Sequence, residues 1–316
     1  MLHNINLKKF TKHVFILVLL TFNAYGGAME NKNISIDKDK IIEVSIGNKV
    51  YKPTLNQEKE ILRVLKIPED EKILRMKSVE IGESELPLVA DFMKKYLLPT
   101  MYESGGIGIA AIQVGVPIRA FIVDIAKTKI INKDDSDKLD VRLFLRGKLE
   151  KGESVIMNET YVEYADNKFI QKNKITRKVP KIKEENGKKQ LIGIEEEVVK
   201  DNNTSPDLVI ERKPYFFLNP KIKLNHNNEI VLPEGCLSVP MESIFKEYNG
   251  NSNVKRLEVI EIEYINENLE KEIMKIDGSK DDYWKWFSRC ARHENDHLDG
   301  VLFVDRLEKV SNDING

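Results

Sequence analysis

"CARHENDHLDG", residues 290–300, contains two histidines four residues apart, with a glutamate directly after the first. On an α-helix, residues at this spacing lie on one face about one turn apart, so both imidazoles could bind the same metal ion. The alternative is a polar helix that carries these residues by chance, but the chain has only five histidines. The stretch therefore predicts a metal-binding helix, and it raises the question of the third ligand.

This helix is expected to run from about Lys280 to Leu298. Asp277 and Ser279 are candidates for its N-terminal cap, because short polar side chains accept hydrogen bonds from the free N–H groups of the first turn. Gly300 is in the place where a helix commonly ends.

The third ligand is not downstream. In one class of zinc protease the motif continues as H-E-x-x-H-x-x-G-x-x-H. Gly300 fits this pattern, but Phe303 stands where the third histidine should be. Another class uses a glutamate tens of residues later, and too little chain remains for that.

Upstream, Cys236 lies in "PEGCLSVP" after an apolar stretch. A thiolate and two imidazoles would leave a fourth tetrahedral position for water. An isolated cysteine is more often a small core residue, so Cys236 alone does not decide the question.

Three motifs follow one another along the chain: GIGIAAIQ (residues 106–113), EGCLS (234–238) and HENDH (293–297). In this order they resemble the three motifs of the peptide deformylase family, G-x-G-[LI]-A-A-x-Q, E-G-C-L-S and H-E-x-D-H. The similarity begins before the first motif, at "ILRVLKIPEDEKILR" (61–75), and covers roughly half the chain. Members of this family remove the formyl group from the N-terminal methionine of new polypeptides.

The resemblance implies one divalent metal ion held by Cys236, His293 and His297. Fe2+ is the expected metal, with Zn2+, Ni2+ or Co2+ as alternatives. It also implies attack of metal-bound hydroxide on the formyl carbon, with Glu294 as general base and then general acid. The Gln113 side chain and the backbone N–H of Leu237 would stabilise the resulting oxyanion.

Five further residues are expected to bind substrate. Gly106 and Gly108 would let a backbone pair with the peptide as an added strand, and Gly235 would free the chain beside Cys236; plain tight turns are the alternative. Cys290 and Trp286, three and seven residues before His293, would wall the methionine pocket or be ordinary core residues.

Contacts that orient the ligand histidines are also expected. Glu234 and Arg292 are candidates for these contacts.

Many family members carry an arginine a few residues after the cysteine motif that helps to hold the substrate. Here Ser243 is near that place and Lys246 is the nearest basic residue, so the resemblance leaves substrate affinity and range open.

The expected fold is α+β, with mixed or antiparallel strands around the metal-binding helix. Strands are expected at "IRAFIVDIA" (118–126) and "RLEVIEIEYIN" (256–266), and a helix in 84–104 with Leu88, Phe92, Tyr96 and Leu97 on its apolar side. The catalytic domain is assigned to residues 59–126 and 214–310, with a polar extension (29–58) before it and a short tail (311–316) after it. Residues 127–213 are interpreted as a charged insertion of β-hairpins or partly disordered chain.

Residues 1–28 have the order of a secretory signal peptide: lysines, an apolar run, then small residues. A membrane anchor and a buried helix are the alternatives, and the expected location stays open because deformylases act in a bacterial cytoplasm or an organelle.

The net charge of −1 gives no bulk attraction to nucleic acid, and the two cysteines give no disulfide framework. The expected partners are formyl-methionyl peptides or nascent chains, the ribosome if the protein is cytosolic, and a membrane at the N-terminus.

Two other functions fit parts of the pattern. A metallopeptidase or other amidase could use the same ligands, although Phe303 and Gln113 argue against it. A non-catalytic or altered-specificity relative could bind formylated peptides, or a partner through the insertion. Activity alone separates this last alternative, because all the expected catalytic residues are present.

Overall fold

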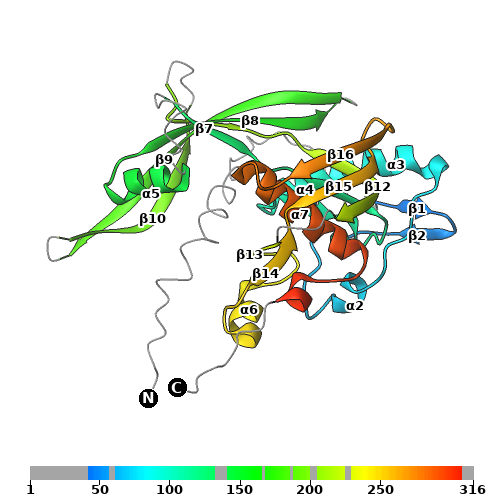
Figure 1. The fold of residues 1–316 in the computed structure, drawn as a ribbon. Coiled ribbons are helices and arrows are strands. Elements are labelled where there is room, and N and C mark those ends of the chain that lie inside the picture. The colour runs from blue at the N-terminus through cyan, green and yellow to red at the C-terminus, as the bar shows by residue number, and fades with distance from the viewer. Residues whose placement is uncertain are drawn as a thin grey trace, which may run out of the picture. The chain divides into compact units, whose positions relative to one another are not determined.

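The computed structural model describes residues 42–56, 61–131, 141–165, 168–185, 188–199, 205–224 and 229–307 (Figure 1). These residues form two compact units, one of residues 42–124 and 215–307 and the other of residues 125–214. Each unit has its own sheet and its own buried apolar residues.

An antiparallel sheet of five strands is the centre of the first unit, in the order β16-β15-β12-β6-β5. The strands are β5 (Gly108–Ala110), β6 (Ala120–Val123), β12 (Tyr215–Leu224), β15 (Val259–Ile265) and β16 (Lys271–Asp277). Alternation along β15 buries Ile260, Ile262 and Tyr264, as a strand with one face on the core requires. The strands predicted in 118–126 and 256–266 are present.

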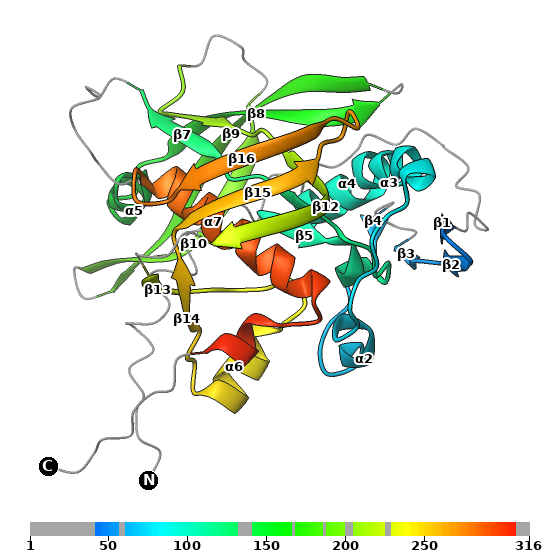
Figure 2. The same cartoon turned by 45° about the vertical axis from the view of Figure 1, so that its right-hand side comes forward.

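Helix α7 (Asp282–Leu298) packs against β5, β6, β12 and β16 and crosses one face of the sheet (Figure 2). Its N-cap is Asp281, whose side chain accepts a hydrogen bond of 2.9 Å from the N–H of Trp284. The predicted caps were wrong: Ser279 donates to Asp277 in a turn before the helix. At the other end, Gly300 has a φ of +71°, and a Cβ there would overlap the carbonyl oxygen of Arg75.

The predicted helix in 84–104 is present but irregular. It consists of α3 (Leu86–Phe92), a π-helical segment η2 (Met93–Leu97) and α4 (Leu98–Glu103). Pro99 explains the irregular turn, because proline has no N–H to donate to the preceding turn and its ring crowds that turn. Leu88, expected on the buried side, is exposed, and Val89 is buried in its place.

A two-stranded sheet carries the segment around Cys236. β13 (Glu229–Pro233) pairs with β14 (Asn253–Leu257), and the chain between them contains α6 (Met241–Tyr248). The remaining elements of this unit are short. They are β1 (Val44–Ile46), β2 (Lys49–Tyr51), β3 (Leu55–Asn56), β4 (Ile61–Leu62), α2 (Glu71–Leu74), η1 (Glu83–Glu85), η3 (Ala111–Val114) and η4 (Phe303–Arg306).

The second unit is a sheet in the order β10-β9-β8-β11-β7 with one described helix. Its elements are β7 (Lys127–Ile130), α5 (Val141–Glu150), β8 (Val155–Ala165), β9 (Lys168–Glu185), β10 (Lys188–Val198) and β11 (Leu208–Glu211). The lysine-rich β9 had not been recognised as a strand. Its lysines pair with glutamates of β10, as in the 2.8 Å ion pair of Lys178 and Glu196, and such cross-strand pairs stabilise a sheet.

The α+β class predicted from the sequence is confirmed, with α7 as the helix that the main sheet packs against. Among the described residues, no helix has the length and apolar character needed to cross a membrane. The signal-like segment 1–28 lies outside the described residues.

The chain passes into the second unit after β6 and returns from it into β12, and these two strands are neighbours in the first unit's sheet. Val123 in β6 is paired directly with Tyr215 in β12. Replacing residues 125–214 by a short Gly/Ser linker should therefore leave β6 and β12 joined as a hairpin, and the first unit should still fold. The measurement is cooperative unfolding of the shortened chain by heat and by urea. Loss of a cooperative transition would show that the second unit is needed for the fold.

Candidate metal centre

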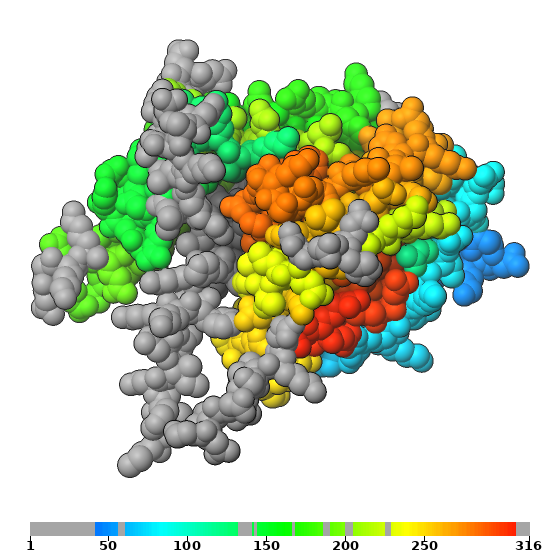
Figure 3. All heavy atoms as spheres, viewed as in Figure 1, coloured from blue at the N-terminus to red at the C-terminus, as the bar shows by residue number. Residues whose placement is uncertain are grey.

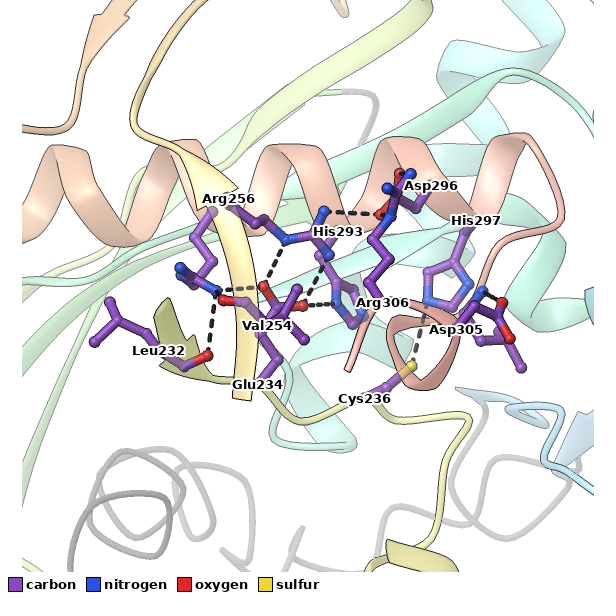
Figure 4. A network of polar contacts seen from close by, with 12 residues as sticks. Leu232, Glu234, Cys236, Val254, Arg256, His293, Asp296, His297, Asp305 and Arg306 are labelled. Atoms are coloured by element: carbon purple, nitrogen blue, oxygen red, sulfur yellow. Dashed lines mark hydrogen bonds and ion pairs between the residues drawn. The ribbon is translucent and has the colours of Figure 1, made fainter. Parts of the chain in front are cut away.

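The structure brings Cys236, His293 and His297 together (Figure 4). One ligand atom from each lies within 4.8 Å of the others, and the Cys236 Sγ is 3.2 Å from the His297 Nε2. Both histidines are buried in α7, while Cys236 is half-buried in the chain after β13. The set consists of one thiol and two imidazoles, which suits a borderline divalent metal ion.

A tight turn presents the thiol. The N–H of Val239 donates to the carbonyl of Cys236 at 3.2 Å, and the N–H of Ser238 points to the Sγ at 3.4 Å. The carbonyl of Ser238 accepts a 3.0 Å hydrogen bond from the N–H of Ile67, which fixes the turn to the chain after β4. Ser238 is fully buried, and the sequence reasoning had given it no role.

Gln113 lies beside the thiol. Its side chain is buried, with Oε1 accepting from the N–H of Ala110 at 2.8 Å. Its Nε2 donates to the Ser238 Oγ at 3.1 Å and lies 3.6 Å from the Cys236 Sγ. The first and second sequence motifs are therefore in direct contact through one amide.

Glu234 orients His293. Its Oε2 is 2.9 Å from the His293 Nδ1, which leaves Nε2 as the ring nitrogen available to a metal ion. Arg256 binds the same carboxylate with two hydrogen bonds of 2.5 and 2.8 Å, and Arg289 adds one of 2.7 Å. Burial acts to raise the pKa of Glu234, but the hydrogen bonds from Arg256 and His293 hold that pKa well below its ordinary value.

The network extends to the last turn of α7. Arg256 also donates to Asp296 at 2.8 Å, and Arg306 binds Asp296 through two hydrogen bonds of 2.6 and 2.8 Å (Figure 4). The aspartate of the HENDH motif is thus held by arginines. Arg292, a sequence candidate for orienting the histidines, donates instead to the carbonyl of Leu257 at 3.3 Å. Arg256, Arg289 and Arg306 had not been identified.

Glu294 is buried beside β5. A Cβ added to Gly108 would lie 2.5 Å from the Glu294 Oε1 and 2.5 Å from the Cys290 Sγ, so only glycine fits there. The other carboxylate oxygen, Oε2, has no hydrogen-bond partner among the described residues. Burial raises the pKa of Glu294 to about 7, with the charge of His293 acting in the opposite direction.

The other predicted substrate residues differ in their surroundings. A Cβ at Gly106 would lie 2.9 Å from Leu237 Cδ1, so this glycine permits close packing of the first two motifs. A Cβ at Gly235 would meet nothing within 4 Å, so packing does not require glycine there. Cys290 is buried with its Sγ 3.5 Å from the carbonyl of Ile107, and Trp286 is half-buried on α7.

The electrostatics fit a metal ion at this set. Burial holds the pKa of His297 well below its ordinary value, so its imidazole is neutral, which is the form that binds metal. At His293, burial acts to lower the pKa, but hydrogen bonds to Cys236 and Glu234 raise it well above its ordinary value. A metal ion would therefore displace a proton from this cluster on binding.

Comparison with known proteins agrees with these motifs. The family model described as polypeptide deformylase matches residues 61–174 and 186–313. The chain belongs to the polypeptide deformylase family. It is therefore an enzyme of this hydrolase class, which works in translation. The match includes residues 127–174 and 186–213, most of the stretch that the sequence interpretation had set apart as an insertion.

Individual relatives are distant. A peptide deformylase of Pelagibacter ubique (strain HTCC1062) is 28% identical over 247 residues, which are 77% of this chain and 86% of the relative. One of Microchaete diplosiphon is 39% identical over 120 residues, 38% of this chain and 51% of the relative. The crystal structure of a Synechococcus elongatus peptide deformylase in complex with actinonin is 20% identical, covers 85% of each chain and has a TM-score of 0.42.

The two cysteines should differ in their effect on metal content. Cys236→Ala removes the thiol from the three-ligand set, so the purified protein should contain little bound metal. Cys290→Ala is the matched control, because its buried Sγ is outside that set. Elemental analysis of both variants after metal loading checks this. Equal metal content in the Cys236 variant and the parent would contradict the assignment.

Proposed function

We propose that this enzyme removes the N-formyl group from the N-terminal formyl-methionine of polypeptides or formyl-peptides in a metal-dependent hydrolysis. The observation that carries the proposal is that the Cys–His–His set lies together with a buried glutamate, Glu294, and a buried amide, Gln113. All three sequence motifs contribute residues to this site. The family membership supports the same reaction.

Cys236, His293 and His297 would hold the metal ion, with Fe2+ as the metal we expect and Zn2+, Ni2+ or Co2+ as alternatives. A divalent ion bound there would polarise the formyl oxygen and make a water more acidic. Glu234 fixes the ring of His293 through its 2.9 Å contact with Nδ1, so the ligand is already oriented before metal binds.

Glu294 would move the proton. Its Oε1 side is packed against β5, and its Oε2 has no partner among the described residues, so one oxygen is free to accept a proton from the attacking water. The same carboxyl would then give a proton to the departing amine as the C–N bond breaks. Formate and a free N-terminal amine are the products.

Gln113 and Leu237 would stabilise the oxyanion that forms when water adds to the formyl carbon. The Gln113 amide is held by Ala110 and reaches the thiol, so its position is set before substrate binds. The backbone N–H of Leu237 follows Cys236 directly. Gly106 and Gly108 border this site, and Cys290 and Trp286 would wall the methionine pocket.

The proposed substrates are formyl-methionyl peptides or nascent chains. Contact with the ribosome or with a membrane would depend on residues 1–28, which lie outside the described residues.

A metallopeptidase function is not favoured. Phe303, at the place of the third histidine in one protease class, is buried, with its ring 5.9 Å from that of His293. Nothing in the described residues favours the other alternative, a protein that binds formylated peptides without cleaving them.

The direct test is hydrolysis of formyl-Met-Ala-Ser by protein purified without air and reloaded with iron, nickel or zinc. We expect formate and Met-Ala-Ser in equal amounts, and no product from the metal-free protein. Cleavage of a peptide bond instead would favour the peptidase alternative, and absence of any product with all three metals would refute the proposal.

Glu294→Ala should keep the metal ion but lose turnover by about 10²–10⁴-fold, the usual worth of general acid–base catalysis. The control is Asn295→Ala, the next residue of α7, which is not part of the three-ligand set. Metal content and kcat are measured for both variants. A Glu294 variant with most of its kcat would show that another group handles the proton.

A further inference from the structure

A cavity of about 400 Å³ lies in the first unit, on the side of α7 opposite the metal ligands. Asn295 lines it, and this residue is two positions from both His293 and His297, which is about 200° around the helix. The described residues that line the cavity include no metal ligand, and neither Gln113 nor Glu294 is among them. The cavity is therefore separate from the candidate metal centre.

Backbone hydrogen bonds hold the walls of this cavity in place. The N–H of Ser78, in the segment after α2, donates to the carbonyl of Leu298 at the end of α7 at 2.8 Å. The N–H of Arg119 donates to the carbonyl of Val79, and the N–H of Asn219 to the carbonyl of Arg119, each at 2.8 Å. Figure 3 shows the end of α7 (red) beside α2 (cyan) and β12 (yellow-green) on one face of the molecule. The cavity is thus preformed, as small-molecule sites usually are.

The wall that β12 contributes is irregular. Its pairing with β15 shifts between Leu218 and Lys221, and Asn219 has a φ of +48°. A positive φ is uncommon for residues other than glycine and persists where surrounding contacts impose it. Here the Asn219 side chain exchanges hydrogen bonds of 2.9 and 2.8 Å with the backbone of Ile81. Such a bulge redirects the side chains that follow it, and Lys221 lines the cavity.

Two side chains of the lining have a buried polar atom without a hydrogen-bond partner among the described residues. These atoms are the Oγ of Ser78 and the Oδ1 of Asn295. Ser78 is only 4% exposed, and leaving such a group unpaired costs about 1–3 kcal/mol. A hydroxyl and an amide can each turn about one side-chain bond toward a group that enters the cavity. The lining therefore offers hydrogen bonds that the described fold does not use.

Charged side chains from several segments complete the lining. Three of them are basic, Lys77, Arg119 and Lys221, and two are acidic, Glu80 and Asp299. Asp299 is already paired with Arg119, with 2.9 Å between its Oδ1 and the arginine Nη1. Three basic groups against two acidic ones leave an excess of positive charge, which favours an anion over a cation.

We propose that this cavity is a second binding site, for a small anion that carries hydroxyl groups and has the size of a sugar phosphate or a sugar acid. Its anionic group would lie at Lys77 and Lys221, and its hydroxyl groups would pair with Ser78 and Asn295. A volume of about 400 Å³ is in the range of small-molecule sites, and an inorganic anion alone would leave most of it unfilled. The occupant would contact α7 between Glu294 and His297.

Calorimetric titration of the nickel-loaded full chain with ribose 5-phosphate, ribonate and ribose tests this. At least one of the two anions should bind about tenfold more tightly than ribose, because hydrogen bonds to charged groups are the stronger ones. The tighter anion distinguishes phosphate from carboxylate as the recognised group. Inorganic phosphate, which lacks the sugar hydroxyls, should bind about fivefold more weakly than ribose 5-phosphate if phosphate is that group. Metal-free protein should give the same affinities, so the result does not depend on deformylation.

Lys221→Ala and Ser78→Ala should each weaken binding of the tighter anion about fivefold, the scale of one hydrogen bond. Ser78→Ala removes a hydroxyl without a partner among the described residues, so Tm should not fall and a weaker affinity would not reflect unfolding. Lys223→Ala is the matched control, because Lys223 is two residues further along β12 and pairs with Glu263.

Four results would overturn the proposal. They are equal binding of ribose and the anions or none at all, binding that requires the metal, equal weakening by Lys223→Ala, and unchanged affinity in both lining variants.

Discussion

The buried carboxylate of Glu234 is the contact on which the site depends. It joins β14 through Arg256, and α7 through Arg289 and His293, so three segments distant in sequence meet at two oxygen atoms. Removing one member of such a buried group leaves an uncompensated charge, at a cost of about 3–5 kcal/mol. Arg256 also reaches Asp296, so the same group fixes the turn of α7 on which His297 lies. The contacts that orient the ligand side chains are therefore the same contacts that pack these segments of the fold together.

Sequence reasoning found the parts of this site that depend on local spacing. They are the i, i+4 histidines, the cysteine after β13 and the glutamine Gln113. Each could be recognised because it belongs to a short motif of its own, and the structure brings them together. Fold class followed from alternating strands and one amphipathic helix. Arg256 and Arg306 could not be found this way, since nothing in their local sequence separates them from the other basic residues of a highly charged chain. Arg292 was a reasonable candidate by proximity to His293, but its direction on the helix leads it to Leu257.

The same limit explains the errors in secondary structure. Asp281 caps α7 because its backbone is extended directly before the first helical residue, whereas Asp277 and Ser279 form their own turn. Strand β9 is rich in lysine and has no clear apolar alternation, so its pairing with glutamates of β10 is visible only once the strands are adjacent. Gly108 shows the reverse case: its motif was recognised, but the reason for glycine is the packing of Glu294 and Cys290 rather than a turn.

The pairing of Val123 with Tyr215 has a consequence for how the chain tolerates length. Closing a loop of some ninety residues in place of a few costs only about 3 kcal/mol in chain entropy, because that cost grows with the logarithm of length. Here the strands on either side of the loop are already hydrogen-bonded neighbours, so we expect the sheet to form whatever the loop contains. Residues 125–214, with their own sheet and core, could melt and refold while the catalytic strands stay paired. Such a position is open to gain, loss or exchange of whole modules over evolutionary time, while the chemistry of the site stays fixed.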